Sequence, residues 1–130
     1  MSYVIKRELP TIDYDAAVTK VTELLASEGF GVLTEIDVKA TLKKKLDVDH
    51  PRYVILGACN PPLAHRALTA EPDIGALLPC NVVVRERDGG GTVISAFKPT
   101  AGFSLVDNQG VAPIAEEVEE RMRRVLARLG

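Results

Sequence analysis

Two kinds of segment follow one another along the chain. In one kind, apolar and polar residues alternate; in the other, apolar residues recur at the spacing of a helix. Residues 3–9 alternate and predict a strand, which Pro10 ends. Asp13 then suits a helix cap, and Gly29 is placed to end that helix in the left-handed conformation. The apolar positions between them have helical spacing: Ala17, Val18, Val21, Leu24 and Leu25.

The middle of the chain repeats this alternation. We expect strands over 31–36 and 52–59, the second of them apolar and β-branched as in a central strand. A short helix over 38–46 follows its capping residue Asp37. A second helix runs to about residue 70, with Asn60 as its cap and proline at its first position. Residues 73–78, between two prolines, predict a short turn-rich segment.

The last third predicts a hairpin, a loop and a closing helix. Residues 81–87 and 92–97 flank Asp88-Gly89-Gly90-Gly91, a turn composition typical of hairpins. We expect a loop over 98–110 and a helix that opens at Pro113. The helix has one apolar face: Ile114, Val118, Met122, Val125 and Leu129.

These elements predict a single domain over residues 1–130 of the α+β class, with two layers and the order β-α-β-α-β-α-β-β-α. A hairpin forces an antiparallel pairing, so the sheet of about five strands is mixed or antiparallel. Four helices suffice to cover one face of it. Apolar runs at 77–78 and 82–84 leave few polar positions for the other face, and we therefore expect a homodimer.

Composition narrows the class of protein. Of 130 residues, 46% are hydrophobic and 26% charged, which excludes a disordered chain. The net charge of -2, with mixed signs throughout, predicts no nucleic-acid partner. The charged residues near the start do not form a signal peptide, and no apolar run is long enough for a membrane span. With two cysteines, we expect a reduced, cytoplasmic protein without a membrane partner.

Both cysteines lie in Cys-Asn pairs at the borders of predicted elements. Cys59-Asn60 belongs to the segment Gly57-Ala58-Cys59-Asn60-Pro61-Pro62, and Cys80-Asn81 follows Pro79. The first pair ends a strand and the second begins the next strand. If these strands are antiparallel neighbours, both pairs lie at one end of the sheet; if they are parallel, they lie about 20 Å apart.

The two Cys-Asn pairs also carry a family resemblance. It also includes Glu71-Pro72 between them, residues 35–38 and 42–46, and the flanking runs 53–62 and 77–85. Together with the two pairs, these segments resemble domain-of-unknown-function family 302. The resemblance covers most of the chain, roughly from the second strand to the hairpin and beyond. It implies a small bacterial or archaeal α/β domain with a compact layer of sheet and helices. The family has no agreed activity, so the resemblance implies none.

The candidate site residues around these pairs allow several chemistries. For binding of a small molecule or a protein partner, they are Cys59, Asn60, Cys80, Asn81 and Arg85. A redox pair requires the two thiols to meet, and free cysteines packed as small apolar side chains are the simpler alternative. Soft ligands could hold zinc or copper at a metal site, for which the candidates are Cys59, His65 and Cys80. Catalytic residues remain unassigned.

Three other groups have simpler interpretations. Because prolines 61 and 62 lack N–H groups, few donors remain to stabilise a thiolate at Cys59. Glu35 and Asp37 point to the same side of a strand and could serve acid/base chemistry, although a helix cap is the commoner role for Asp37. The three lysines at 43–45 could form an anion patch, but a solvated helix face explains them as well.

From the sequence we therefore predict a non-enzymatic, homodimeric domain without a cofactor. It would bind a small ligand or a protein partner at the end of the sheet that carries the two Cys-Asn pairs. The alternative is a thiol-redox protein, or a zinc- or copper-binding protein, that uses Cys59 and Cys80.

Overall fold

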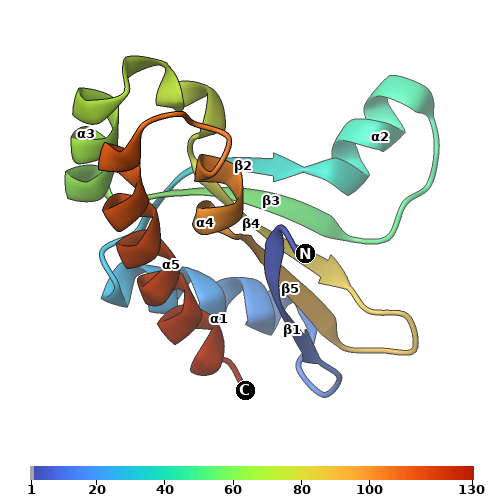
Figure 1. Cartoon of the computed structure of the whole chain (residues 1–130). Coiled ribbons are helices and arrows are strands. Elements are labelled where there is room, and N and C mark those ends of the chain that lie inside the picture. Colours follow the sequence, from blue (N-terminus) through green and yellow to red (C-terminus); the bar gives the residue numbers. More distant parts are fainter. Residues whose placement is uncertain (1) are drawn as a thin grey trace.

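Five strands form one sheet in the computed structural model, which describes residues 2–130 (Figure 1). The order across the sheet is β1-β5-β4-β3-β2, and every neighbouring pair is antiparallel. The antiparallel alternative of the sequence prediction is therefore confirmed. The strands are β1 (Val4–Leu9), β2 (Gly31–Asp37), β3 (Tyr53–Cys59), β4 (Cys80–Glu86) and β5 (Thr92–Phe97).

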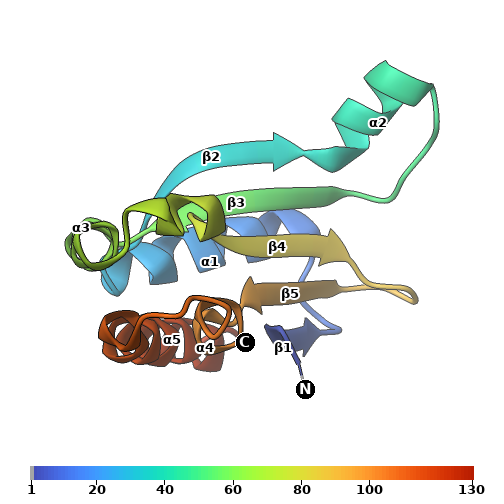
Figure 2. The same ribbon diagram turned by 45° about the horizontal axis from the view of Figure 1, so that its top comes forward.

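The helices differ in what they cover. Helices α1 and α5 lie side by side against one face of the sheet, and α3 packs against α5 at one end, whereas α2 projects away from the sheet (Figures 1 and 2). The α-helices are α1 (Tyr14–Ser27), α2 (Val38–Leu46), α3 (Pro61–Ala70), α4 (Pro99–Phe103) and α5 (Ala112–Ala127), and the 3-10 helices are η1 (Pro72–Leu77) and η2 (Gln109–Val111).

The helix starts follow the capping rules. The side chains of Asp13, Asp37 and Asn60 each accept a hydrogen bond from a backbone N–H in the first turn of α1, α2 and α3, respectively. Gly29, with a φ of 85°, lies just after the end of α1. These four predicted helix signals are confirmed.

The prediction of a loop over 98–110 was wrong in part. This segment contains the short helix α4 and the start of η2. A tertiary contact stabilises it: the buried carboxylate of Glu119 in α5 accepts hydrogen bonds from the Thr100 amide (3.1 Å) and hydroxyl (2.6 Å). Phe103 is also buried. Such a long-range partner leaves no trace in local spacing. The turn-rich segment at 73–78 is likewise more regular than expected, since it forms η1.

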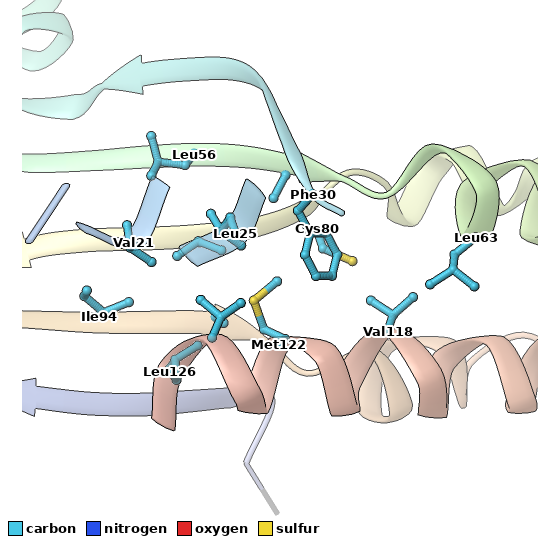
Figure 3. Packing of buried hydrophobic residues seen from close by; sticks show 14 of the residues in the cluster. Val21, Leu25, Phe30, Leu56, Leu63, Cys80, Ile94, Val118, Met122 and Leu126 are labelled. Carbon is cyan, nitrogen blue, oxygen red and sulfur yellow. The ribbon is translucent and has the colours of Figure 1, made fainter. Parts of the chain in front are cut away.

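The core lies between the sheet and its helices (Figure 3). Strand alternation turns every second side chain of β3, β4 and β5 toward the helices, and these side chains are buried: Val54, Leu56, Ala58, Val82, Val84, Ile94 and Ala96. Helix α5 contributes Met122, which is fully buried, and α1 contributes Val21 and Leu25. The predicted apolar faces of these two helices are the faces that pack.

The opposite face of the sheet, which we call the open face, carries the alternate residues of each strand. Its centre is formed by the half-buried side chains of Ile55 and Val83, which are register partners on β3 and β4. Next to them Ile36 on β2 is 48% exposed. Toward the ends of the face, polar residues such as Asn81 and Arg85 are mixed with apolar ones, among them Val93 on β5, which is buried (2% exposed). This face is more apolar than a fully solvated surface and less buried than a core.

The chain's first strand is held to its last helix. The guanidinium of Arg7 on β1 donates hydrogen bonds to the backbone oxygens of Leu126 (2.6 Å) and Leu129 (2.7 Å) at the end of α5. These bonds tie β1 to the backbone at the end of α5, where the Leu126 oxygen also accepts a hydrogen bond from the Leu129 amide (3.3 Å). Nowhere in residues 2–130 is there a helix with the length and apolar character to cross a membrane.

Candidate functional site

The two Cys-Asn pairs meet at one end of the sheet, which we call the rim. Strands β3 and β4 are antiparallel neighbours, with Ala58 opposite Cys80 and Gly57 opposite Asn81. Cys59 and Cys80 therefore lie at the same end of adjacent strands. Of the two arrangements that the sequence left open, the one with a shared rim is present.

The two thiols nevertheless point to different faces. Cys80 is opposite the buried Ala58, is only 5% exposed and lies in the core cluster with Phe30 and Leu63 (Figure 3). Cys59 is one residue further along β3, so alternation turns it to the open face, where it is partly exposed. Both are free. A disulfide needs side chains directed toward each other, and this arrangement does not provide that.

The environment of Cys80 suppresses its ionisation. Burial raises the pKa of the Cys80 thiol to about 12, and the nearby Cys59 contributes in the same direction. A thiol with this pKa is almost entirely protonated at neutral pH, and only the thiolate is a good nucleophile or metal ligand. Cys80 thus behaves as a small apolar core residue.

The two asparagines also have different surroundings. The Asn60 side chain is 7% exposed; it accepts a hydrogen bond from the Leu63 amide (3.2 Å) and donates one to the Glu28 carbonyl (3.4 Å). It caps α3 and links this helix to the end of α1. Asn81 lies on the open face and is exposed. Only Asn81 is available to a ligand.

Arg85 lies far from the rim. It is four residues beyond Asn81 on β4 and opposite Tyr53, the first residue of β3. At about 3.3 Å per residue, the two positions are about 13 Å apart. Of the five predicted binding residues, the structure therefore brings Cys59 and Asn81 together on the open face. Asn60 and Cys80 face the interior, and Arg85 is at the opposite end of the open face.

The predicted metal ligands do not converge. His65 is an exposed residue of α3, and Cys80 is in the core. Within residues 2–130, no three His, Cys, Asp or Glu side chains are placed to hold one metal ion.

Thr34 is a rim residue that the sequence analysis missed. A Cβ atom added at Gly57 would lie 2.2 Å from the Thr34 hydroxyl oxygen and 2.9 Å from Cγ of Pro79. Thr34 on β2 and Pro79 thus close over the backbone of Gly57 beside Asn81. A glycine inside a strand pattern signals such a close approach. Which residue of β2 approaches Gly57 depends on the pairing of β2 with β3 and on the register shift between Val32 and Thr34.

Apart from the rim, a cavity of about 360 Å³ lies between α4 and the start of α5. Its apolar lining includes Phe103, Val106 and Val111, and its polar lining includes Asp107 and Glu116. It is separate from the two Cys-Asn pairs, and local sequence patterns did not indicate it.

Comparison with known proteins supports the family resemblance. The family described as "Domain of unknown function DUF302" matches residues 5–129. The chain belongs to the DUF302 family. A crystal structure of an uncharacterized conserved DUF302 protein from Bacillus stearothermophilus is similar to it, with 31% sequence identity, a TM-score of 0.90 and coverage of 98% of each chain. Among curated protein sequences, no significant match to the chain is found. DUF302 membership thus establishes the fold and carries no activity with it.

Proposed function

We propose that this DUF302 domain is a non-enzymatic homodimeric binding domain. Its binding surface would be the rim end of the open face, with Cys59 and Asn81 as the polar contacts and the Ile55–Val83 pair as the apolar centre. The observation that carries the proposal is this open face, where half-exposed apolar side chains border polar ones. Surfaces with an apolar centre and a polar border are typical of binding sites on soluble proteins.

The shape of the surface favours an extended partner over a small ligand. Small molecules bind mainly in concave pockets that enclose most of their surface. A sheet face offers a broad area instead, and a peptide or protein segment laid across β2, β3 and β4 could bury Ile36, Ile55 and Val83 at once. Asn81, with one donor and one acceptor group, suits hydrogen bonding to a polypeptide backbone.

A non-enzymatic role fits the surroundings of the candidate side chains. The amide of Asn60 is already used in capping α3, and the Cys80 thiol is held protonated in the core. Cys59 remains on the open face as a single accessible thiol. Cys59 can contact a bound partner without a neighbouring base, because binding does not require its thiol to lose a proton.

The test uses a displayed peptide library and a small-molecule fragment collection as probes of the purified chain. Hits are remeasured against Val83→Glu, which places a charge at the centre of the open face, and Asn81→Ala. The control is Thr22→Glu, at an exposed position of α1. We expect at least about tenfold weaker binding for Val83→Glu, a smaller loss for Asn81→Ala and no change for the control.

Hits that bind all four proteins equally would contradict the proposed site. The variant Cys59→Ser tests the prediction that the protein is not an enzyme. We expect a folded variant with altered binding only, and loss of a measurable turnover in this variant would refute a non-enzymatic role.

A further inference from the structure

Helix α2 is only partly covered in the single chain: Val38 and Leu42 are half-buried, and the helix contacts β2 and β3. It is nine residues long, none of its residues is buried, and it projects beyond the end of the sheet (Figures 1 and 2). Its apolar side chains nevertheless form a stripe at i, i+4 and i+8: Val38, Leu42 and Leu46. Leu46 is 65% exposed, and Val48 in the following turn is 43% exposed.

Such a helix needs packing to be stable. Isolated helices shorter than about 12–15 residues are marginal in water, and most helical stability in proteins comes from an apolar face that packs. The local supports of α2 are the Asp37 cap on the Ala40 amide (2.9 Å) and the exposed Lys43–Asp47 pair (3.0 Å). Exposed ion pairs contribute about 0–1 kcal/mol. The exposed apolar side chains of Leu46 and Val48 therefore call for a second surface.

The polar side of α2 is basic. It carries Lys39, Lys43, Lys44 and Lys45. Lys39 donates a hydrogen bond to the His50 carbonyl, and Lys43 pairs with Asp47 and Asp49. Within residues 2–130, Lys44 and Lys45 form no ion pair. Their charges are free to meet carboxylates of another molecule.

An acidic groove lies beside the root of α2. It has a volume of about 290 Å³ between α1 and the edge of the sheet, and it is lined by Tyr14, Asp15, Val18, Thr19, Glu35, Asp37 and Val54. Burial raises the pKa of Tyr14, and the carboxylates of Asp37, Asp15 and Glu35 raise it further against the opposing effect of Arg52. The groove therefore keeps a net negative charge, although Arg52 pairs with Asp15 (3.3 Å), and its accessible apolar lining is the half-buried Val18, since Val54 belongs to the core.

We propose that α2 of one protomer docks against the acidic groove of a second copy, and that the second copy's α2 docks reciprocally. The exposed end of the stripe at Leu46 would cover the half-buried Val18, while Lys45, which flanks the stripe, would face Glu35. This inference rests on the proposed homodimer and names its interface.

A second copy fits because both halves of the interface lie on one patch. Asp37 lines the groove and also caps α2. A two-fold dimer requires one patch that is complementary to itself, and a basic apolar helix next to an acidic groove meets this condition. The helix cannot enter its own groove, because no linker separates β2 from α2. Docking through α2 also leaves the rim of the open face accessible.

The experiment measures molar mass in solution by sedimentation across chain concentrations, with circular dichroism to confirm folding. We expect the wild type to dimerise, and Leu42→Asp/Leu46→Asp to weaken dimerisation at least about tenfold. Glu35→Lys and Lys45→Glu should each weaken it, and both changes in one chain should restore it. The matched control is Leu105→Asp, an 81% exposed leucine outside the interface, which should remain dimeric.

A second readout needs no substitution. Amide hydrogen exchange in α2 should slow as the chain concentration rises, while exchange in the exposed turn at 88–90 stays constant. A wild-type dimer that α2 variants leave intact but Val83→Glu disrupts would overturn this interface and retain the homodimer. A wild type that is monomeric throughout would overturn both. Binding of a monomeric chain through α2 to phosphatidylserine vesicles would overturn it in favour of a membrane surface.

Discussion

The two Cys-Asn pairs contain the same two residues and use them in opposite ways. In Cys59-Asn60 the cysteine lies on the open face and the asparagine is buried as a helix cap. In Cys80-Asn81 the cysteine is buried in the core and the asparagine is exposed. The pairs lie at one rim, on adjacent strands.

The difference arises from where each pair lies relative to the strand. Antiparallel pairing places Cys80 opposite Ala58, so Cys80 shares the helix-covered face with it, and Cys59 must take the other face. After Cys59 the chain leaves the sheet and turns into α3, which draws Asn60 inward. A repeated motif therefore does not imply a repeated role, because strand register determines which residue is accessible.

Thiol labelling should separate the two cysteines most strongly. With a pKa of about 12, Cys80 has a thiolate fraction of roughly one in 10⁴ at pH 8, so labelling in the folded chain should be about 10³-fold slower than that of an ordinary thiol. We expect one thiol per native chain to react with iodoacetamide, and the second to react after denaturation in urea. Fast labelling of native Cys59→Ser would show that Cys80 is accessible.

Serine substitution should affect stability unequally. Cys80→Ser places a hydroxyl among apolar side chains and should lower the free energy of unfolding by about 1–3 kcal/mol. Cys59→Ser, at the partly exposed position, should change it by less than about 0.5 kcal/mol. Urea denaturation of both variants measures the difference. Equal losses would mean that the two thiols have equivalent surroundings.

Alkaline pH should destabilise the protein through Cys80. Its pKa in the folded chain lies above the ordinary value, so its contribution to stability is complete below the unfolded-state pKa of about 8.5 and decreases as the pH rises toward about 12. Between these values, this group lowers the free energy of unfolding by up to about 1.4 kcal/mol per pH unit. Cys80→Ala should show a shallower decline from pH 9 to 11 than Cys59→Ala, and parallel profiles would contradict this assignment.

Substitution of the two asparagines should give the smallest difference in stability. Here the residue of the first pair, Asn60, should matter more, whereas for the cysteines it is the residue of the second pair, Cys80. Asn60→Ala removes the cap of α3 and should cost about 1 kcal/mol of stability. Asn81→Ala, at an exposed strand position, should stay within about 0.5 kcal/mol of the wild type. Thermal unfolding of both variants tests this. A larger loss for Asn81→Ala would indicate that the open face is covered by something its side chain contacts.

Most of the fold could be predicted from local chemistry. Capping side chains, the glycine after α1 and the prolines predict the starts and ends of α1, α2 and α3, because these signals act within one turn of the chain. Helix α4 was missed because its stability depends on Glu119, nineteen residues beyond Thr100. Long-range hydrogen bonds of this kind have no local pattern.

The candidate site could be predicted only in part. The shared rim followed from an antiparallel arrangement that the sequence allowed but did not require. Which of Cys59, Asn60, Cys80 and Asn81 face outward depends on register, which one residue of shift would invert. The proximity of Thr34 to Gly57 depends on the pairing of β2 with β3. Capping residues, prolines and turn residues do not predict which residues of two strands lie opposite each other.

The contacts of Arg7 have a consequence for the order in which the domain is assembled during synthesis. Strand β1 leaves the ribosome first, yet its partner β5 begins at Thr92, and the carbonyls that Arg7 binds belong to Leu126 and Leu129. Strand β1 therefore has no partner in the sheet until β5 has been made. Its three consecutive charged residues, Lys6, Arg7 and Glu8, are of the kind that disfavours aggregation of an unpaired strand. Completion of the sheet must wait for β5, and the Arg7 contacts must wait for the residues that end α5.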